Sequence, residues 1–118
     1  MKLLYTAIIL LVLFGCSSII NQGQSNNLQI DEINIPTAQC YMCVANIENA
    51  LNGIDGILKY KVELETNKVK VKYNTDKLSL QSIEQSISKA GYQANNTAAD
   101  VDAYNKLSMC CRLPKDRR

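Results

Sequence analysis

Apolar and polar residues alternate strictly through residues 58–73, and this pattern predicts two adjacent β-strands. Because successive side chains of a strand point to opposite faces, we expect one buried and one solvated face. Thr66-Asn67 separates the two runs and predicts the turn of an antiparallel hairpin. The apolar positions are Leu58, Tyr60, Val62, Leu64, Val69, Val71 and Tyr73, and most positions between them are lysine or glutamate.

Two segments that flank this hairpin follow the period of a helix instead. Apolar residues recur every three or four positions in both, which puts them on one helical face. A glycine follows each segment, as it follows many helices. The apolar positions are Val44, Ile47 and Leu51 in the first segment and Leu80, Ile83, Ile87 and Ala90 in the second.

Shorter patterns predict a strand at each end of this region. Ile33 and Ile35 alternate with polar residues before Pro36, and residues 92–94 predict a short last strand. The resulting order, β-α-β-β-α-β, predicts an α+β domain of the ferredoxin-like type over residues 28–95. We expect a four-stranded antiparallel sheet with two helices on one face. Residues 96–118 follow as a C-terminal extension, with a short helix near residues 100–107 and a mobile basic tail.

The first 15 residues predict the signal peptide of a lipoprotein. Lys2 precedes an apolar run that is too short to span a bilayer. The run ends at Gly15-Cys16, which resembles the lipobox of bacterial lipoproteins, whose cysteine is acylated after cleavage. We therefore expect a lipid on Cys16, a polar tether over residues 16–27, and a membrane-anchored location in the bacterial cell envelope, facing the periplasm or the exterior. An uncleaved membrane anchor is the alternative.

Composition excludes several kinds of chemistry. The chain has 118 residues and a net charge of +2, which argues against a nucleic-acid binder. It has no histidine, so Ser-His-Asp triads and histidine-ligated metal sites are excluded. Five cysteines remain as the residues with distinctive chemistry.

Cys40 and Cys43 form a Cys-x-x-Cys motif between the first predicted strand and the first predicted helix. A helix N-terminus favours negative charge and therefore stabilises thiolates. Two thiolates suit a soft ion such as Cu(I) or Hg(II), whereas Zn(II) would need further ligands. The same motif also fits a thiol–disulfide oxidoreductase or a structural disulfide.

Residues from about 33 to 94 resemble the heavy-metal-associated domain family, which includes copper chaperones, modules of copper-exporting ATPases and a periplasmic mercuric-ion binding protein. The family motif, Gly-Met-x-Cys-x-x-Cys, is followed by Ile-Glu-x-Ala-Leu and later by Ala-Gly-Tyr. The matching residues are Cys40, Cys43, Ile47-Glu48-Asn49-Ala50-Leu51 and Ala90-Gly91-Tyr92, whereas Thr37 and Ala38 replace the family's Gly and Met. The resemblance implies that Cys40 and Cys43 bind the metal and that Tyr92 lies near the metal loop, where it could instead cap the core. Met42 lies in the metal loop itself and is expected to point to solvent or a partner.

Cys110 and Cys111 have no counterpart in that motif. They could complete a four-sulfur site with Cys40 and Cys43, or pass metal to the loop or to a partner. Alternatively, they could pair with the other cysteines in disulfides outside the cytoplasm, since adjacent cysteines do not form an ordinary disulfide with each other.

The sequence thus predicts an extracytoplasmic, lipid-anchored metal-binding protein that is not an enzyme. It would act as a chaperone or a sequestering module through the Cys40/Cys43 thiolates, with Cu(I) favoured and Hg(II) or Zn(II) as other ions. We expect its partner to be a metal transporter or another metal-binding domain. A thiol–disulfide oxidoreductase that uses the same two cysteines is the alternative function, and a lipoprotein with two inert disulfides is a third interpretation.

Overall fold

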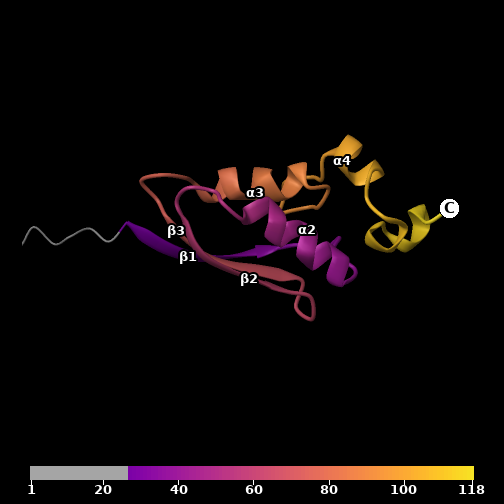
Figure 1. Cartoon of the computed structure of the whole chain (residues 1–118), viewed down its shortest axis with the longest axis horizontal. Helices are drawn as coiled ribbons and strands as arrows, with labels where there is room; N and C mark the ends of the chain where they lie inside the picture. The colour runs from indigo at the N-terminus through magenta and orange to yellow at the C-terminus, as the bar shows by residue number, and fades with distance from the viewer. Residues whose placement is uncertain (1–26) are drawn as a thin grey trace, which may run out of the picture.

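The computed structural model describes residues 27–118, which form an antiparallel sheet covered on one face by two helices (Figure 1). The elements of this domain are β1 (Leu28–Asn34), α2 (Tyr41–Leu51), β2 (Ile57–Glu63), β3 (Lys68–Asn74) and α3 (Leu80–Lys89). β3 is the central strand and pairs antiparallel with both β1 and β2. The α+β architecture, the hairpin and the two main helices are therefore confirmed.

The core lies between the sheet and the two helices. The sequence pattern identified most of its members, although at the start of α2 Cys43 is buried and the predicted Val44 is only partly buried. The fully buried residues of these elements include Ile33 in β1, Cys43, Ile47 and Leu51 in α2, Val69 and Val71 in β3, and Ile83 and Ile87 in α3.

The prediction is wrong at the first position of the buried hairpin face. Leu58 was expected to be buried, but its side chain is 58% exposed. The pairing of β2 with β3 is irregular between Ile57 and Lys59, and Ile57 packs against the core instead. An extra residue in one strand changes which side chains face the core, and an alternating pattern in sequence does not reveal it.

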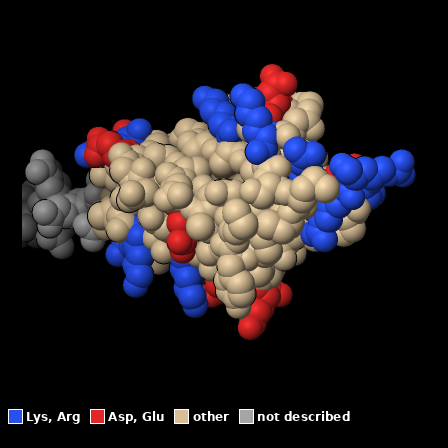
Figure 2. All heavy atoms as spheres, turned by 45° about the vertical axis from the view of Figure 1, so that its right-hand side comes forward, with Lys and Arg blue, Asp and Glu red and all other residues tan. Residues whose placement is uncertain are grey.

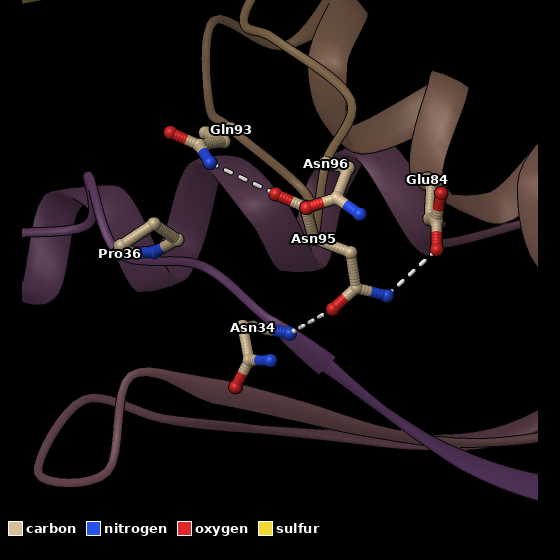
Figure 3. A pocket seen from close by; sticks show the side chains of 6 residues that line it. All are labelled: Asn34, Pro36, Glu84, Gln93, Asn95 and Asn96. Atoms are coloured by element: carbon tan, nitrogen blue, oxygen red, sulfur yellow. Dashed lines mark hydrogen bonds between the residues drawn. The ribbon is translucent and has the colours of Figure 1, made fainter.

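The predicted fourth strand is also wrong, because the sheet of the described residues has three strands. Residues 92–94 lie beside the end of β1 but form no ladder, and the chain turns at Asn95, which has a φ of 50°. The Asn95 side chain accepts a hydrogen bond from the Asn34 backbone N–H at 2.8 Å and donates one to Glu84 at 2.6 Å (Figure 3). The Asn95 backbone N–H also donates to the Asn34 carbonyl at 2.8 Å, so one backbone bond and one side-chain bond take the place of a strand ladder.

The C-terminal extension is folded, contrary to the predicted mobile tail. It contains α4 (Val101–Asn105) and two 3-10 turns, η1 (Met109–Cys111) and η2 (Pro114–Asp116). The segment before α4 is joined to α3, since Asp100 N donates to the Ser88 carbonyl at 3.0 Å and Ser88 Oγ donates to the Ala98 carbonyl at 2.6 Å. Figure 1 shows the extension at the same end of the molecule as the start of α2.

Several predictions concern residues before the described range. The signal peptide, the lipidated Cys16 and all but the last residue of the tether lie outside the described residues. Within residues 27–118, no helix is both long and apolar enough to cross a membrane.

Candidate metal centre

Four cysteine sulfurs gather at the N-terminal end of α2, and Cys40 lies at their centre. Cys40 Sγ is 3.6 Å from Cys43 Sγ, 3.6 Å from Cys110 Sγ and 3.7 Å from Cys111 Sγ. The sulfurs of Cys110 and Cys111 are 4.0 Å apart. All four are free thiols. The fold therefore brings together two pairs of cysteines that are about 70 residues apart in sequence.

The loop before α2 fixes the first pair. Cys40 is the N-cap residue of α2 and has an extended backbone, with φ −151° and ψ 172°. Cys43 lies in the first turn, is completely buried, and accepts a hydrogen bond from the Gln39 backbone N–H at 3.4 Å. Thr37 Oγ1 accepts a hydrogen bond from the Gln93 backbone N–H at 3.1 Å, which joins this loop to the segment after α3. The loop is thus held at both ends.

The extension fixes the second pair through hydrogen bonds between its own short elements. The Tyr104 hydroxyl accepts a hydrogen bond from the Leu113 backbone N–H at 2.8 Å, and Arg117 donates one to the Cys110 carbonyl at 3.2 Å. Cys111 is completely buried and belongs to the core, whereas Cys110 is exposed. One thiol of this pair therefore faces the protein and the other faces solvent.

The thiols of Cys40 and Cys111 differ in their tendency to ionise. Burial alone would raise the pKa of the Cys40 thiol, but hydrogen bonds from the Cys43 backbone N–H and from the other three thiols lower its pKa from 9.0 to about 7. Burial raises the pKa of Cys111, and its hydrogen bond with the Cys43 thiol raises it further. Cys40 is therefore a thiolate at neutral pH more readily than Cys111, whose proton would be released when a metal ion binds the sulfur.

Tyr92 and Met42, the two other residues predicted near the metal loop, both lie beside these sulfurs. Tyr92 is completely buried, and its hydroxyl accepts a hydrogen bond from Asn46 Nδ2 at 2.9 Å. Burial raises the pKa of Tyr92, and its interactions with the thiols of Cys43 and Cys111 act in the same direction. Met42 is half exposed, and its sulfur is 3.5 Å from Cys110 Sγ. Tyr92 is thus both a core residue and a neighbour of the thiols.

Sequence reasoning missed Asn46 and the residues that hold the extension. Asn46 Nδ2 donates a hydrogen bond to the Tyr92 hydroxyl and lies 4.0 Å from Cys111 Sγ. Asn46 therefore connects α2 to the second cysteine pair. Its position three residues after Cys43, on the same side of a helix, was the available signal. No periodic pattern marks the hydrogen bonds of Tyr104 and Arg117, because they connect short irregular elements.

Basic side chains stand out at the end of the molecule that the extension forms (Figure 2). Residues 112–118 contribute Arg112, Lys115, Arg117 and Arg118. Large uncharged side chains are exposed around the cysteines, since Tyr41 is 84% and Met109 48% exposed. The cysteine cluster therefore lies beside both a basic segment and exposed apolar side chains.

Comparison with known proteins finds a family match for the domain and none that includes the cysteines of the extension. The heavy-metal-associated domain family matches residues 32–93, so Cys40 and Cys43 lie inside the match and Cys110 and Cys111 outside it. The copper chaperone CopZ of Enterococcus hirae is 38% identical over 63 residues, which is 53% of this chain and 91% of the chaperone. CopZ of Staphylococcus aureus is 33% identical over 60 residues, 51% of this chain and 88% of the chaperone. Both relatives are metal carriers and not enzymes.

Solved structures show the same fold over the same region. Oxidized MerP from Ralstonia metallidurans CH34 has a TM-score of 0.55 and 25% identity, and the match covers 58% of this chain and 94% of MerP. The N-terminal domain of a potential copper-translocating P-type ATPase from Bacillus subtilis, in its Cu(I)-loaded state, has a TM-score of 0.55 and 28% identity, over 58% of this chain and 85% of that domain. The chain belongs to the heavy-metal-associated domain family.

Proposed function

We propose that this protein is a carrier of a soft metal ion that binds through Cys40 and Cys43. The observation that carries the proposal is the position of these thiols, 3.6 Å apart at the N-terminus of α2. The helix N-terminus stabilises thiolate charge, and soft thiolate ligands favour Cu(I). The copper chaperones among the relatives support Cu(I) as the first cargo to test, and Hg(II) and Zn(II) are the next.

Delivery of the ion requires that another protein can reach it. Cys40 is partly exposed and Cys43 is completely buried, so an incoming thiolate would approach from the Cys40 side. Tyr41 is 84% exposed and offers an apolar contact next to that approach. A metal transporter or a second metal-binding domain would then receive the ion by thiolate exchange. The likeness to a domain of a potential copper-translocating ATPase supports a transporter as the partner.

The proposed location rests on the sequence before the folded domain. Residues 1–15 would be removed as a signal peptide, Cys16 would be acylated, and residues 16–27 would tether the domain to the membrane outside the cytoplasm. Replacement of Cys16 by serine should move the protein from the membrane fraction to the soluble fraction. Retention of Cys16→Ser in the membrane fraction would favour an uncleaved anchor.

Metal binding can be measured directly on the reduced chain that begins at Ser17, which keeps every described residue. Anaerobic titration with Cu(I), Hg(II) and Zn(II) against a competing chelator should give a tight complex with Cu(I). Binding should be lost in Cys40→Ser/Cys43→Ser and kept in Tyr41→Ser, which changes the exposed residue between the two cysteines. Failure of the wild-type chain to bind any of the three ions would refute the carrier function.

A thiol–disulfide oxidoreductase is the second candidate, because the pKa of Cys40 is lowered to about 7 as in reactive cysteines. The two functions differ in turnover. A carrier should reduce a model disulfide no faster than a free dithiol at equal concentration. Catalysed reduction that disappears in Cys40→Ser and persists with a strong metal chelator present would favour the oxidoreductase.

A further inference from the structure

We propose that Cys110 and Cys111 join Cys40 in a three-thiolate metal site, so that the C-terminal extension holds the ion inside the carrier. This inference rests on the proposed function, since it concerns how the same cargo is bound. It assigns a role to two residues that lie outside the family match. It also predicts a coordination that two cysteines alone cannot provide.

The three sulfurs form a nearly regular triangle. Its edges are 3.6 Å, 3.7 Å and 4.0 Å. The centre of such a triangle is about 2.2 Å from each corner, close to the metal–thiolate bond of about 2.3 Å seen for zinc. An ion can therefore bind all three sulfurs in trigonal geometry with almost no movement of the protein. Among the described residues, these three form a group in which every ligand atom lies within 4.8 Å of the other two.

The Cys40/Cys43 pair fits a linear complex less well. Two thiolates on opposite sides of an ion, each with a bond of about 2.3 Å, would be about 4.6 Å apart. The two sulfurs are 3.6 Å apart, so a linear complex would require them to separate by roughly an ångström. Cys43 is completely buried and its sulfur accepts a backbone hydrogen bond, which restrains that movement. A site with more than two thiolates requires less change.

The extension is built to deliver its sulfurs independently of any metal. Asp100 caps α4 by accepting a hydrogen bond from the Ala103 backbone N–H at 2.8 Å. Leu107 packs against the core, and Cys111 itself is completely buried there. Asn46 of α2 reaches the Cys111 sulfur at 4.0 Å. The second cysteine pair is thus held against the first by packing and hydrogen bonds rather than by chance proximity.

Charge and polarisability around the triangle suit a complex of three thiolates. Three thiolates around a monovalent ion leave a net charge of about −2, which needs nearby positive charge. Arg117 donates to the Cys110 carbonyl at 3.2 Å and to the Arg112 carbonyl at 2.9 Å, so its guanidinium lies beside the site. Arg112 in turn donates to the Leu107 carbonyl at 3.1 Å. The Met42 sulfur, 3.5 Å from Cys110 Sγ, adds a soft neighbour on the exposed side.

This arrangement makes release depend on the extension. Cys40 belongs both to the Cys-x-x-Cys pair and to the triangle, so the ion can move between the two sets without leaving Cys40. Cys110 is the exposed member of the triangle and is the ligand that a partner thiolate would displace first. The extension therefore retains the ion until a partner supplies a replacement ligand.

X-ray absorption of the chain from Ser17, loaded with one equivalent of Cu(I), tests the proposal without any substitution. Three sulfur ligands per copper are expected in the wild-type protein. Two sulfur ligands in linear geometry would overturn the inference. This measurement does not depend on whether a variant folds.

Variants then assign the ligands. Cys110→Ser/Cys111→Ser should lower the sulfur count to two and weaken Cu(I) binding by about tenfold or more, because a docked third ligand acts at high effective concentration. Cys110→Ser alone leaves the buried cysteine in place and should also lower the count, with an unchanged circular dichroism spectrum. Met109→Ser, which removes the half-exposed neighbouring sulfur, is the matched control and should keep the wild-type count and affinity.

The outcomes separate this inference from the proposed function. If Cu(I) binds tightly, depends on Cys40 and Cys43, and shows the same two-sulfur spectrum with and without Cys110 and Cys111, the inference is wrong and the carrier function stands. If the wild-type chain binds no soft ion, both are wrong. A three-sulfur count that falls in the extension variants, but not in Met109→Ser, supports both.

Discussion

Residues 37–51 and residues 96–118 each bring two cysteines to the same point, but different contacts hold the two segments. The first segment is held mainly by apolar burial, since Ile47 and Leu51 of α2 are completely buried against the sheet. The second has one fully buried side chain, Cys111, and its short elements are joined to one another by hydrogen bonds such as those of Tyr104 and Arg117. We call residues 37–51 the core-bound segment and residues 96–118 the docked segment, which reaches the core through Cys111 and Leu107.

This difference has a consequence for stability and for function. Burial of whole side chains contributes several kcal/mol, whereas a single hydrogen bond contributes about 0.5–1.5 kcal/mol net. We therefore expect the extension to open locally while the rest of the domain stays folded. In the proposed three-thiolate site, such opening would allow the ion to leave on contact with a partner without unfolding of the domain.

The largest expected effect tests the contrast in burial. Ile47→Ala leaves a cavity under α2 and should lower the free energy of unfolding by about 2–5 kcal/mol. Val101→Ala, at a position of α4 that is 70% exposed, is the matched control and should change it by less than about 0.5 kcal/mol. Chemical denaturation of the metal-free proteins measures both. Equal losses would contradict the division into a core-bound and a docked segment.

The sequence predicted the core-bound segment well because its signal is periodic. The helical spacing of Ile47 and Leu51 and the alternation of Val69 and Val71 each repeat over several turns or residues, and all four residues are buried. The same reasoning failed at Leu58, where an irregular pairing shifts the register. Periodicity reports which face is buried, and it does not report a local insertion.

The sequence predicted the docked segment poorly because its contacts are not periodic. Cys110 and Cys111 were recognised as chemically notable, but several roles remained open until the fold placed them 3.6 Å and 3.7 Å from Cys40. The predicted last strand failed for a related reason, since one side-chain bond and one backbone bond between Asn95 and Asn34 take the place of a ladder. Single side-chain hydrogen bonds over long sequence separations leave no pattern in the chain.

A pH experiment extends the comparison to two tyrosine hydroxyls, one on buried Tyr73 of β3 and one on partly exposed Tyr104 of the extension. Burial and a hydrogen bond to Asp31 at 2.7 Å raise the pKa of Tyr73 to about 12. Because the folded pKa lies above the ordinary value of about 10, the fold favours the protonated tyrosine, and this stabilisation is present below pH 10 and is lost as the pH rises toward 12. The loss should reach about 2–3 kcal/mol at the upper end.

Denaturation of the metal-free protein at several pH values between 8 and 12 measures this loss. Tyr73→Phe should remove that part of the pH dependence. Burial and Asp116 also raise the pKa of Tyr104. Because Tyr104 lies in the docked extension, Tyr104→Phe should nevertheless keep most of the pH dependence of the unfolding free energy. Identical pH profiles for Tyr73→Phe and the wild-type protein would show that Tyr73 does not couple ionisation to unfolding.

Gly91 tests the contact between the turn after α3 and α4 of the extension. Its φ is +99°, and a Cβ there would lie 3.1 Å from the Ala103 backbone in α4. Gly91→Ala should therefore cost about 1–3 kcal/mol from backbone strain and should also push α4 away. Gly53→Ala is the matched control, because Gly53 has a φ of +78° but nothing within 4 Å of the added Cβ.

The two glycine variants should differ in the exposure of Cys111. Alkylation of the metal-free protein, followed by peptide mass spectrometry, should show faster modification of Cys111 in Gly91→Ala than in Gly53→Ala. Equal rates in the two variants would mean that contact between Gly91 and α4 does not hold the extension in place.

The smallest expected effect concerns one hydroxyl inside the extension. Tyr104→Phe removes a hydroxyl that donates to Asp116 at 2.7 Å and accepts from the Leu113 backbone N–H at 2.8 Å. The local cost should be about 1 kcal/mol, enough to speed hydrogen exchange of the Leu113 amide several-fold without changing the denaturation midpoint. Tyr41→Phe, at an 84% exposed position, should leave that amide unchanged. A denaturation midpoint lowered by an amount equivalent to the same ~1 kcal/mol would mean that the extension unfolds together with the core. In that case, release of the ion from the proposed site would require a partner to unfold the domain rather than to displace the docked segment.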